Sequence, residues 1–207
     1  MTCLSSLSDK LTPIVPDTSV LINLNACTFG EQVLRAIPND IILTETVVEE
    51  LNHETSYANG ENGFIQRLIS ENVVKVVEMD DAAVRLFEMM ISSPGSLDDG
   101  EAATIGVAVS QGFLPIIDER KGRARAQSLM NGQAPAWSLD LLVHPAAQSE
   151  LVGDGYIEAV YLALRKGRMR IDEERCDAVV QLIGIERAIT CSSLPGFKER
   201  REFWLSA

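Results

Sequence analysis

Four acidic residues of this sequence follow predicted strands or lie near the start of predicted helices. They are Asp17, Glu50, Glu101 and Asp118. Carboxylates that converge on one crevice repel one another, and a divalent cation removes that cost. Oxygen ligands, two isolated histidines and the absence of a C-x-x-C pair select Mg²⁺ or Mn²⁺ over zinc. Such ions activate water and stabilise phosphoryl charge, so the acids predict metal-assisted hydrolysis of a phosphodiester.

The first two acids also have structural explanations. Asp17 separates two apolar runs and is able to cap the helix that starts near Val20, although it stands a little early for that role. Its position after a predicted strand favours a site. The alternative for Glu50 is an exposed carboxylate on a helix surface, which is also what we expect of its neighbour Glu49.

For Glu101 and Asp118, the structural explanations compete more strongly with a role in a site. Asp98-x-x-Glu101 has the form of a capping box, and its spacing alone favours a helix cap over a site. Asp118 ends an apolar strand, where a turn residue is the alternative, but the strand end favours a site. Glu119 follows directly and competes with Asp118 for the same role.

Short apolar runs alternate with helical patterns along the chain. Strands are predicted at 13–15, 41–43, 73–77, 113–117 and 134–137. Helical segments are predicted at 20–24, 33–34, 46–53, 64–69, 80–91, 97–112, 120–130, 156–165 and 173–183. A loop is expected around 59–63 and a turn at 92–96. The alternation predicts an α/β fold with a mostly parallel sheet of four to five strands, covered on both faces. Ligands of such sheets bind beyond the carboxyl ends of the strands, where Asp17 and Asp118 stand.

Composition narrows the classes of protein. The 207 residues carry a net charge of −12, and 46% of them are apolar, which predicts a sizeable core. The charge argues against a general nucleic-acid coat protein but not against a nuclease. No apolar run is long enough to span a bilayer and the start lacks a secretory pattern, so a soluble cytoplasmic protein with free thiols is expected.

Four ordered blocks resemble the PIN-domain family. They read P-D-T-S-V-L-I-N-L, T-V-V-E-E-L, L-D-D-G-E-A-A-T-I-G-V-A and I-I-D-E-R-K-G-R-A-R-A. The third block is similar to a prokaryotic branch with L-D-x-G-E-A, and the four together are fairly specific. The resemblance implies a Rossmann-like three-layer sandwich over 12–170, with 171–207 as a helical extension packed on the same domain. It also implies an Mg²⁺- or Mn²⁺-dependent endoribonuclease.

The resemblance assigns roles by position. It implies that Asp17, Glu50, Glu101 and Asp118 are the catalytic and metal-binding acids, with Glu119 still open as the fourth. Glu50 matches rather than Glu49 because it immediately precedes Leu51. Ser19 matches a small hydroxyl that orients the first acid or the water, and Asp98 is a secondary candidate. Serine at this position also excludes a haloacid-dehalogenase-like phosphatase, which needs a second aspartate there.

Two basic segments are candidates to bind an RNA backbone. They are Arg120, Lys121, Arg123 and Arg125, and later Arg165, Lys166, Arg168 and Arg170. A solvated helix face is an equally good explanation for any one of them. Lys121 and Arg125 share one helix face and Arg120 and Arg123 another, so only one pair is able to face RNA.

The resemblance also implies partners. Many PIN proteins of this size are toxins of type II toxin–antitoxin pairs, form dimers, and are inhibited by a small antitoxin whose arginine enters the acidic pocket. The charge of −12 suits a basic antitoxin segment. A different class stays open, in which a PIN-like domain with a weak or inactive site serves as a binding or regulatory module.

Overall fold

The protein is described by a computed structural model that covers residues 5–7, 11–92 and 95–206. Within these ranges the chain forms two compact units. One comprises 11–21, 38–92 and 95–136, and the other comprises 5–7, 22–37 and 137–206. We call the first the sheet unit, because it holds the strands, and the second the helical unit. The predicted boundary between residues 170 and 171 stays a prediction.

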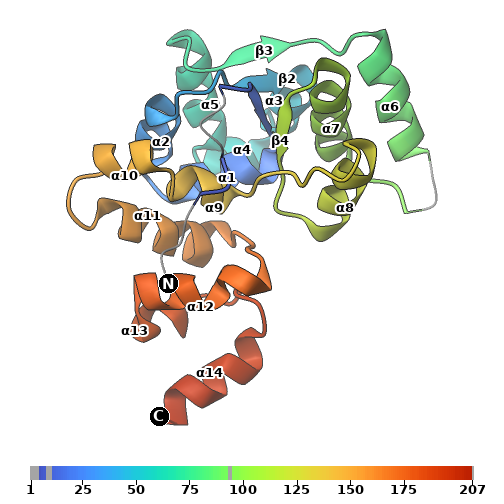
Figure 1. Ribbon diagram of the computed structural model, residues 1–207. Coiled ribbons are helices and arrows are strands. Elements are labelled where there is room, and N and C mark those ends of the chain that lie inside the picture. The colour runs from blue at the N-terminus through green and yellow to red at the C-terminus, as the bar shows by residue number, and fades with distance from the viewer. Residues whose placement is uncertain (1–4, 8–10, 93–94, 207) are drawn as a thin grey trace. The chain divides into compact units, whose positions relative to one another are not determined.

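The strands of the sheet unit are short and parallel. β1 (Ile14–Pro16) pairs with β4 (Leu114–Ile116), and β2 (Ile42–Thr44) pairs with β3 (Lys75–Val77), as labelled in Figure 1. Single parallel bridges, Ile14–Ile41 and Ile116–Ala136, lie beside these pairs. β1 and β2 are buried throughout, as expected for strands that are covered on both faces. The fold is therefore α/β with short parallel strands, whereas one sheet of four to five strands stays a prediction.

The fifth strand predicted at 134–137 does not form. Ala136 makes one bridge, in which its N–H donates to Pro115 O at 3.0 Å and its carbonyl accepts from Ile117 N at 3.0 Å. The next bond of this parallel ladder would run from the N–H of residue 115 to Ala134 O, and Pro115 has no N–H. The segment therefore touches the edge of β4 at a single residue.

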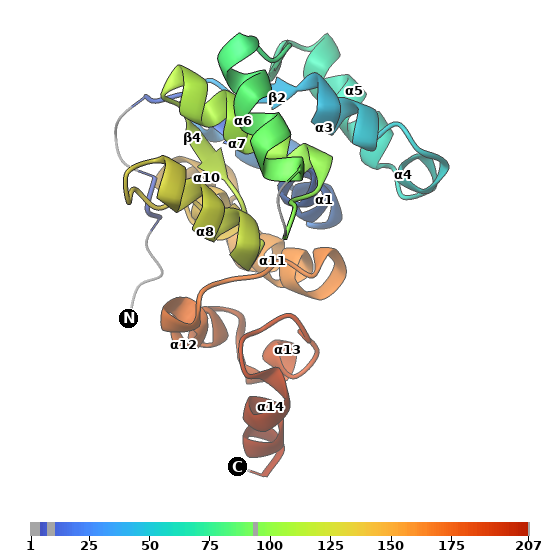
Figure 2. The same ribbon diagram turned by 90° about the vertical axis from the view of Figure 1, so that its right-hand side faces the viewer.

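The helices of the sheet unit surround these strands. They are α3 (Glu45–Glu50), α4 (Glu54–Ala58), α5 (Glu61–Ser70), α6 (Asp81–Ile91), α7 (Asp99–Gln111), α8 (Arg120–Leu129) and the first residues of α1 (Thr18–Ala26). α7 is buried along 100–108 and lies against β1, β2 and β4 (Figure 1). It also packs against α6 and α8 (Figure 2), and Gly106 lets the backbone of α6 approach, since a Cβ there would lie 2.9 Å from Ala83 O.

Side chains or a glycine cap several helix ends. Thr44 caps α3 by accepting a hydrogen bond from Val47 N at 3.2 Å, and Asp80 caps α6 through Ala83 N at 2.7 Å. Gly112 ends α7 in a left-handed conformation, with φ of 68°. The loop predicted at 59–63 is shorter than expected, because α5 already begins at Glu61 after the left-handed Gly60.

The helical unit contains α2 (Gly30–Ala36), α9 (Ser138–Leu142), α10 (Pro145–Glu150), α11 (Gly155–Leu162), a π-helical turn η1 (Ala163–Gly167), α12 (Glu173–Ile183), α13 (Ile185–Ala188) and α14 (Phe197–Ser206). The helix predicted at 173–183 is confirmed. The one predicted at 156–165 is shorter, since its last turn widens into η1.

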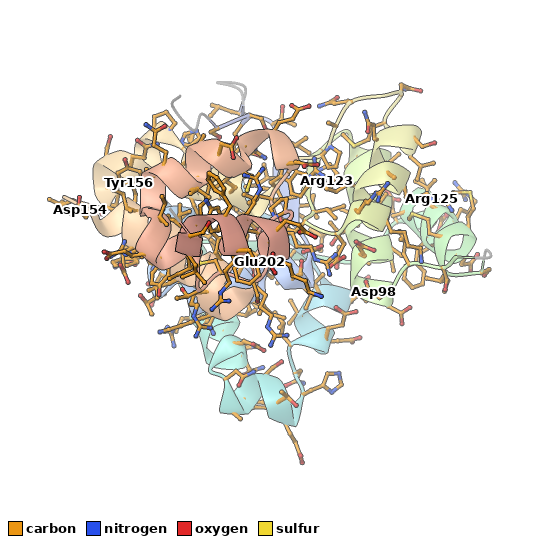
Figure 3. The ribbon with its side chains drawn as sticks, turned by 90° about the horizontal axis from the view of Figure 1, so that it is seen from below. Asp98, Arg123, Arg125, Asp154, Tyr156 and Glu202 are labelled. Carbon is orange, nitrogen blue, oxygen red and sulfur yellow. The ribbon has the colours of Figure 1, made fainter. Side chains whose placement is uncertain are left out.

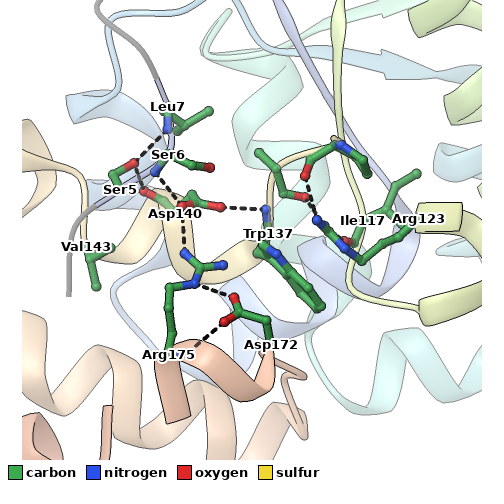
Figure 4. Close-up of polar contacts among 12 residues, drawn as sticks. Ser5, Ser6, Leu7, Ile117, Arg123, Trp137, Asp140, Val143, Asp172 and Arg175 are labelled. Atoms are coloured by element: carbon green, nitrogen blue, oxygen red, sulfur yellow. Dashed lines mark hydrogen bonds and ion pairs between the residues drawn. The ribbon is translucent and has the colours of Figure 1, made fainter. Parts of the chain in front are cut away.

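A buried aspartate organises the helical unit. Asp140 is fully buried and accepts hydrogen bonds from Ser6 N at 2.6 Å and Trp137 N at 2.8 Å. It also forms an ion pair with Arg175 of α12 at 2.8 Å (Figure 4). Burial of a charge is tolerated when such partners satisfy it. Within this unit, residues after 170 therefore pack with residues before it.

Two further expectations concern cysteines and membranes. Cys27, Cys176 and Cys191 are free and buried, and Cys3 lies outside the described ranges, as does part of the turn expected at 92–96. Burial raises the pKa of the Cys27 thiol to about 12. Among the helices of the described ranges, none is both long and apolar enough to cross a bilayer.

Candidate functional site

Asp17 stands at the junction between β1 and α1. It is 3% exposed, and Asp17 N donates to Ile116 O at 3.2 Å, which continues the pairing of β1 with β4. Its Oδ1 accepts hydrogen bonds from Ser19 Oγ and from Val20 N, both at 2.8 Å. α1 begins at Thr18, earlier than the sequence pattern indicated, so Asp17 is its N-cap as well as a strand-end acid.

Asp17 is surrounded by like charges. Burial raises the pKa of the Asp17 carboxyl well above its ordinary value, and the neighbouring carboxylate of Asp118 raises it further. The charge of Glu101 acts in the same direction, against the hydrogen bonds from Val20 and Ser19, which lower the pKa. Three of the four predicted acids therefore interact electrostatically within the sheet unit.

Glu101 reaches the site from the first turn of α7. Asp98 is the N-cap of this helix and accepts a hydrogen bond from Glu101 N at 2.9 Å (Asp98 is labelled in Figure 3). The Glu101 carboxylate is buried and lies against Gly122 of α8, so closely that a Cβ on Gly122 would collide with it. The cap is therefore made by Asp98, and the Glu101 side chain extends to the site side of α8.

Asp118 and Glu119 follow β4 but differ in their surroundings. Asp118 is 3% exposed and its charge acts on Asp17, whereas Glu119 is half-buried and occupies the N-cap position of α8. The Glu119 side chain makes no capping hydrogen bond. Of the two candidates for the fourth acid, Asp118 is the one that the structure brings next to Asp17.

Glu50 is held differently from the other acids. It ends α3, and its carboxylate accepts hydrogen bonds from Gly100 N at 2.7 Å and from the hydroxyl of Thr18. Gly100 directly precedes Glu101, and Thr18 directly follows Asp17. Glu50 thus ties the start of α7 to the start of α1, next to the acids, with both of its oxygens already accepting hydrogen bonds.

The basic residues that open α8 do not share one role. Arg123 donates to three backbone carbonyls of the sheet unit, and the choice between the two candidate RNA-facing pairs stays a prediction. Lys121 donates to Ser96 O. Arg120 is exposed. Arg125, which is labelled in Figure 3, is half-buried on the same helix.

The donor set fits a hard divalent cation in its chemistry. Asp17, Glu101 and Asp118 are buried carboxylates that repel one another, and a cation would offset that repulsion. Among the described residues, no group of three or more His, Cys, Asp or Glu side chains is placed to hold a metal ion. The carboxylates present suit Mg²⁺ or Mn²⁺ by their chemical type.

Three functional neighbours were not foreseen from the sequence. Thr18 donates to Glu50, Gly100 presents its N–H to Glu50, and Gly122 makes room for Glu101. A Cβ on Gly100 would collide with the Glu50 carboxylate. The only signal was the position of these residues inside the motifs D-T-S, D-D-G-E and R-K-G-R.

One of three comparisons with known proteins finds a match. A family model described as a PIN domain matches residues 13–185, which is most of the chain. The chain therefore belongs to the PIN-domain family, a nuclease-like class of hydrolases. Searches of curated proteins and of solved structures each return no match.

Proposed function

We propose that this protein is a metal-dependent endoribonuclease whose site lies at the strand ends of the sheet unit. The observation that carries the proposal is the buried Asp17, whose pKa is raised by burial and by the charges of Asp118 and Glu101. Buried acids with perturbed pKa values at the ends of parallel strands are typical of functional sites. Membership of the PIN-domain family supports hydrolysis as the reaction class.

Each residue of the site has a distinct part in the proposal. Asp17, Glu101 and Asp118 would hold Mg²⁺ or Mn²⁺, which when bound supplies an activated water and stabilises phosphoryl charge. Ser19 fixes the Asp17 carboxylate through its 2.8 Å hydrogen bond. Glu50 accepts hydrogen bonds from Gly100 and Thr18 and so keeps α7 and α1 in place, and proton acceptance is assigned to Glu50 or Asp118.

RNA binding needs cations that are exposed to solvent. Arg120 remains exposed on α8, and a second basic cluster lies in the helical unit, on and after η1. Its members are Arg165, Lys166, Arg168 and Arg170, all exposed. We assign these groups to backbone phosphates, because phosphate contacts supply affinity without sequence preference.

The direct test is RNA cleavage with Mn²⁺ by the wild type and by Asp17→Asn. The substitution keeps the size of the side chain but removes the charge, so the rate is expected to fall by about 100-fold or more. Asp154→Asn is the matched control, since Asp154 is an exposed aspartate of the helical unit (Figure 3). Equal cleavage by wild type and Asp17→Asn would remove the catalytic proposal.

One specific observation favours the alternative function, a binding or regulatory module without catalytic activity. The acids of the described ranges are not grouped as a closed metal site, which suits a binding or regulatory module. Absence of Mn²⁺-dependent cleavage, together with tight binding of a partner, would support the module instead.

The proposed cellular role is that of a type II toxin. The partner would be a small basic antitoxin whose arginine pairs with the acids around Asp17, and a homodimer would be the resting form. The net charge of −12 supports a basic partner. A small basic protein from the adjacent reading frame should bind the wild type and lose affinity for Asp17→Asn.

A further inference from the structure

Arg123 donates three hydrogen bonds to backbone carbonyls from one guanidinium. Nη1 donates to Ile117 O at 2.7 Å and to Ala136 O at 2.8 Å, and Nη2 donates to Pro135 O at 2.7 Å (Figure 4). Only arginine presents a planar fork of donors that is able to reach several acceptors at once. A solvated arginine on a helix face would not make these contacts.

The three carbonyls lie where the pairing beyond β4 is weakest. The ladder between β4 and the 135–136 segment rests on one bridge at Ala136, with hydrogen bonds of 3.0 Å from Ile117 N and to Pro115 O. Pro115 of β4 is unable to add another toward Ala134 O because it lacks an N–H. The guanidinium supplies the cross-links that the backbone does not.

The carbonyl of Ile117 is connected to the site through the peptide bond to Asp118. Ile117 O belongs to the peptide bond that leads into Asp118, so the end of β4 is fixed at Ile117 by Arg123 through the carbonyl and by Ala136 through the N–H. Asp118 in turn is the neighbour whose charge most affects Asp17. The location of the Asp118 carboxylate therefore depends on where Arg123 holds the end of β4.

We propose that Arg123 is a positioning residue that sets Asp118 against Asp17 by clamping the end of β4 to the 135–136 segment. The inference deepens the proposed nuclease function and rests on it for its catalytic consequence. It also replaces the RNA-facing role that the helical spacing suggested. Arg123 acts through the backbone and does not contact the substrate.

The first test compares Arg123→Gln and Arg123→Lys with Arg85→Gln, an exposed arginine of α6. Affinity for Mn²⁺ is measured by electron paramagnetic resonance at a temperature where all variants are folded. Loss of a group that supports a ligand typically costs about 10- to 100-fold in affinity, so Arg123→Gln is expected to weaken Mn²⁺ binding by that factor. Arg123→Lys should weaken it as well, because one ammonium does not span three carbonyls, whereas Arg85→Gln should match the wild type.

Kinetics separate positioning from RNA binding. A positioning residue predicts a lower kcat with an unchanged KM for RNA and an unchanged dependence of KM on salt. An arginine that binds phosphate predicts a raised KM and a shallower salt dependence. Raised KM with unchanged kcat in Arg123→Gln would overturn the proposal, as would Mn²⁺ affinity equal to that of the wild type.

A metal-free measurement keeps this inference separate from the nuclease proposal. Amide hydrogen exchange in Arg123→Lys, which retains the charge and most of the stem, should speed up at Ile117 and Ala136 and stay unchanged at Val15 in β1. Unchanged exchange at Ile117 and Ala136 would overturn the clamp. If the wild type binds no Mn²⁺ while the exchange result holds, the nuclease proposal fails and the clamp stands.

Discussion

The burial of Asp17 lowers the stability of the fold when its carboxyl is ionised. It is buried between β1 and α1, and burial together with the charges of Asp118 and Glu101 raises the pKa of its carboxyl. Its hydrogen bonds from Ser19 and Val20 offset only part of that cost. A charge kept in such surroundings is expected of a site that is selected for function over stability.

Stability should depend on pH through Asp17 in a defined direction. Its carboxyl has a pKa that is higher in the folded than in the unfolded chain, so the folded state binds the extra proton. The free energy of unfolding therefore decreases as pH rises from the ordinary pKa of 3.8 through the raised pKa, and the full penalty persists above it. Without metal, Asp17→Asn should be more stable than the wild type at about pH 7, with a gap that shrinks toward the ordinary pKa.

Thermal or urea unfolding in a chelator checks this expectation. Asp154→Asn is again the control, because an exposed aspartate should change the midpoint little at neutral or acid pH. A gap between Asp17→Asn and wild type that stays the same from neutral pH down to the ordinary pKa would contradict the assigned pKa direction.

At the scale of elements, two glycines allow helices to meet around the acids. Gly122 lets α8 lie directly on the Glu101 carboxylate of α7, and Gly100 lets the start of α7 receive Glu50 of α3. Neither glycine has a positive φ, so the backbone would accept alanine at both positions. What alanine would displace is the carboxylate of the neighbouring element.

Gly122→Ala should therefore separate stability from function. Alanine in a helix interior is favoured over glycine by about 0.5–1 kcal/mol, and the Glu101 side chain is flexible enough to move aside. The midpoint of unfolding is expected to hold or rise, while Mn²⁺ affinity falls by roughly 10-fold or more.

Gly63→Ala provides the matched control for this substitution. Gly63 is exposed in α5, and a Cβ added there would meet Arg67 Nη1 at 3.6 Å, an ordinary contact. It should gain helix stability and leave Mn²⁺ affinity alone. Wild-type affinity in Gly122→Ala would show that the Glu101 carboxylate has no part in binding the ion.

At the scale of the whole molecule, the proposed RNA substrate is a polyanion and the chain itself is acidic. The net charge is −12, so the proposed RNA affinity has to come from local cations. The exposed basic residues on and after η1 gather four cations within six positions of the chain, from Arg165 to Arg170. A π-helical turn is a frequent feature of functional segments, which supports the assignment.

Replacing Arg165, Lys166 and Arg168 together with glutamine tests that assignment. If each contacts one phosphate of single-stranded RNA, the slope of log affinity against log salt should become shallower by roughly 2. A triple change of Lys75, Arg85 and Lys198, exposed cations elsewhere, alters the net charge equally and is the control. Equal slopes for the two triple variants would reject a specific role for this segment.

Local chemistry explains which parts of the molecule were predictable. The apolar runs before Asp17 and Asp118 depend on neighbours within a few residues, and they formed strands as expected. The role of Arg123 depends on carbonyls at 135 and 136, which only the fold brings to the end of β4.

The hydrogen bonds of Glu50 also depend on contacts that only the fold creates. Its partner Gly100 lies in a different helix, so spacing could place Glu50 near the site but could not show that its oxygens were engaged. The fifth strand did not form for a similar reason, because its ladder needed an N–H from residue 115 of β4, which is a proline far away in the sequence.

The central claim is that Asp17, Glu101 and Asp118 hold a catalytic divalent cation. The most direct measurement is anomalous diffraction from crystals of the wild type soaked in Mn²⁺, with Asp17→Asn crystals treated identically. The account predicts an anomalous peak bounded by Asp17 and Asp118 in the wild type and its loss in the variant. A wild-type site without a peak, or a peak bound by other residues, would contradict it.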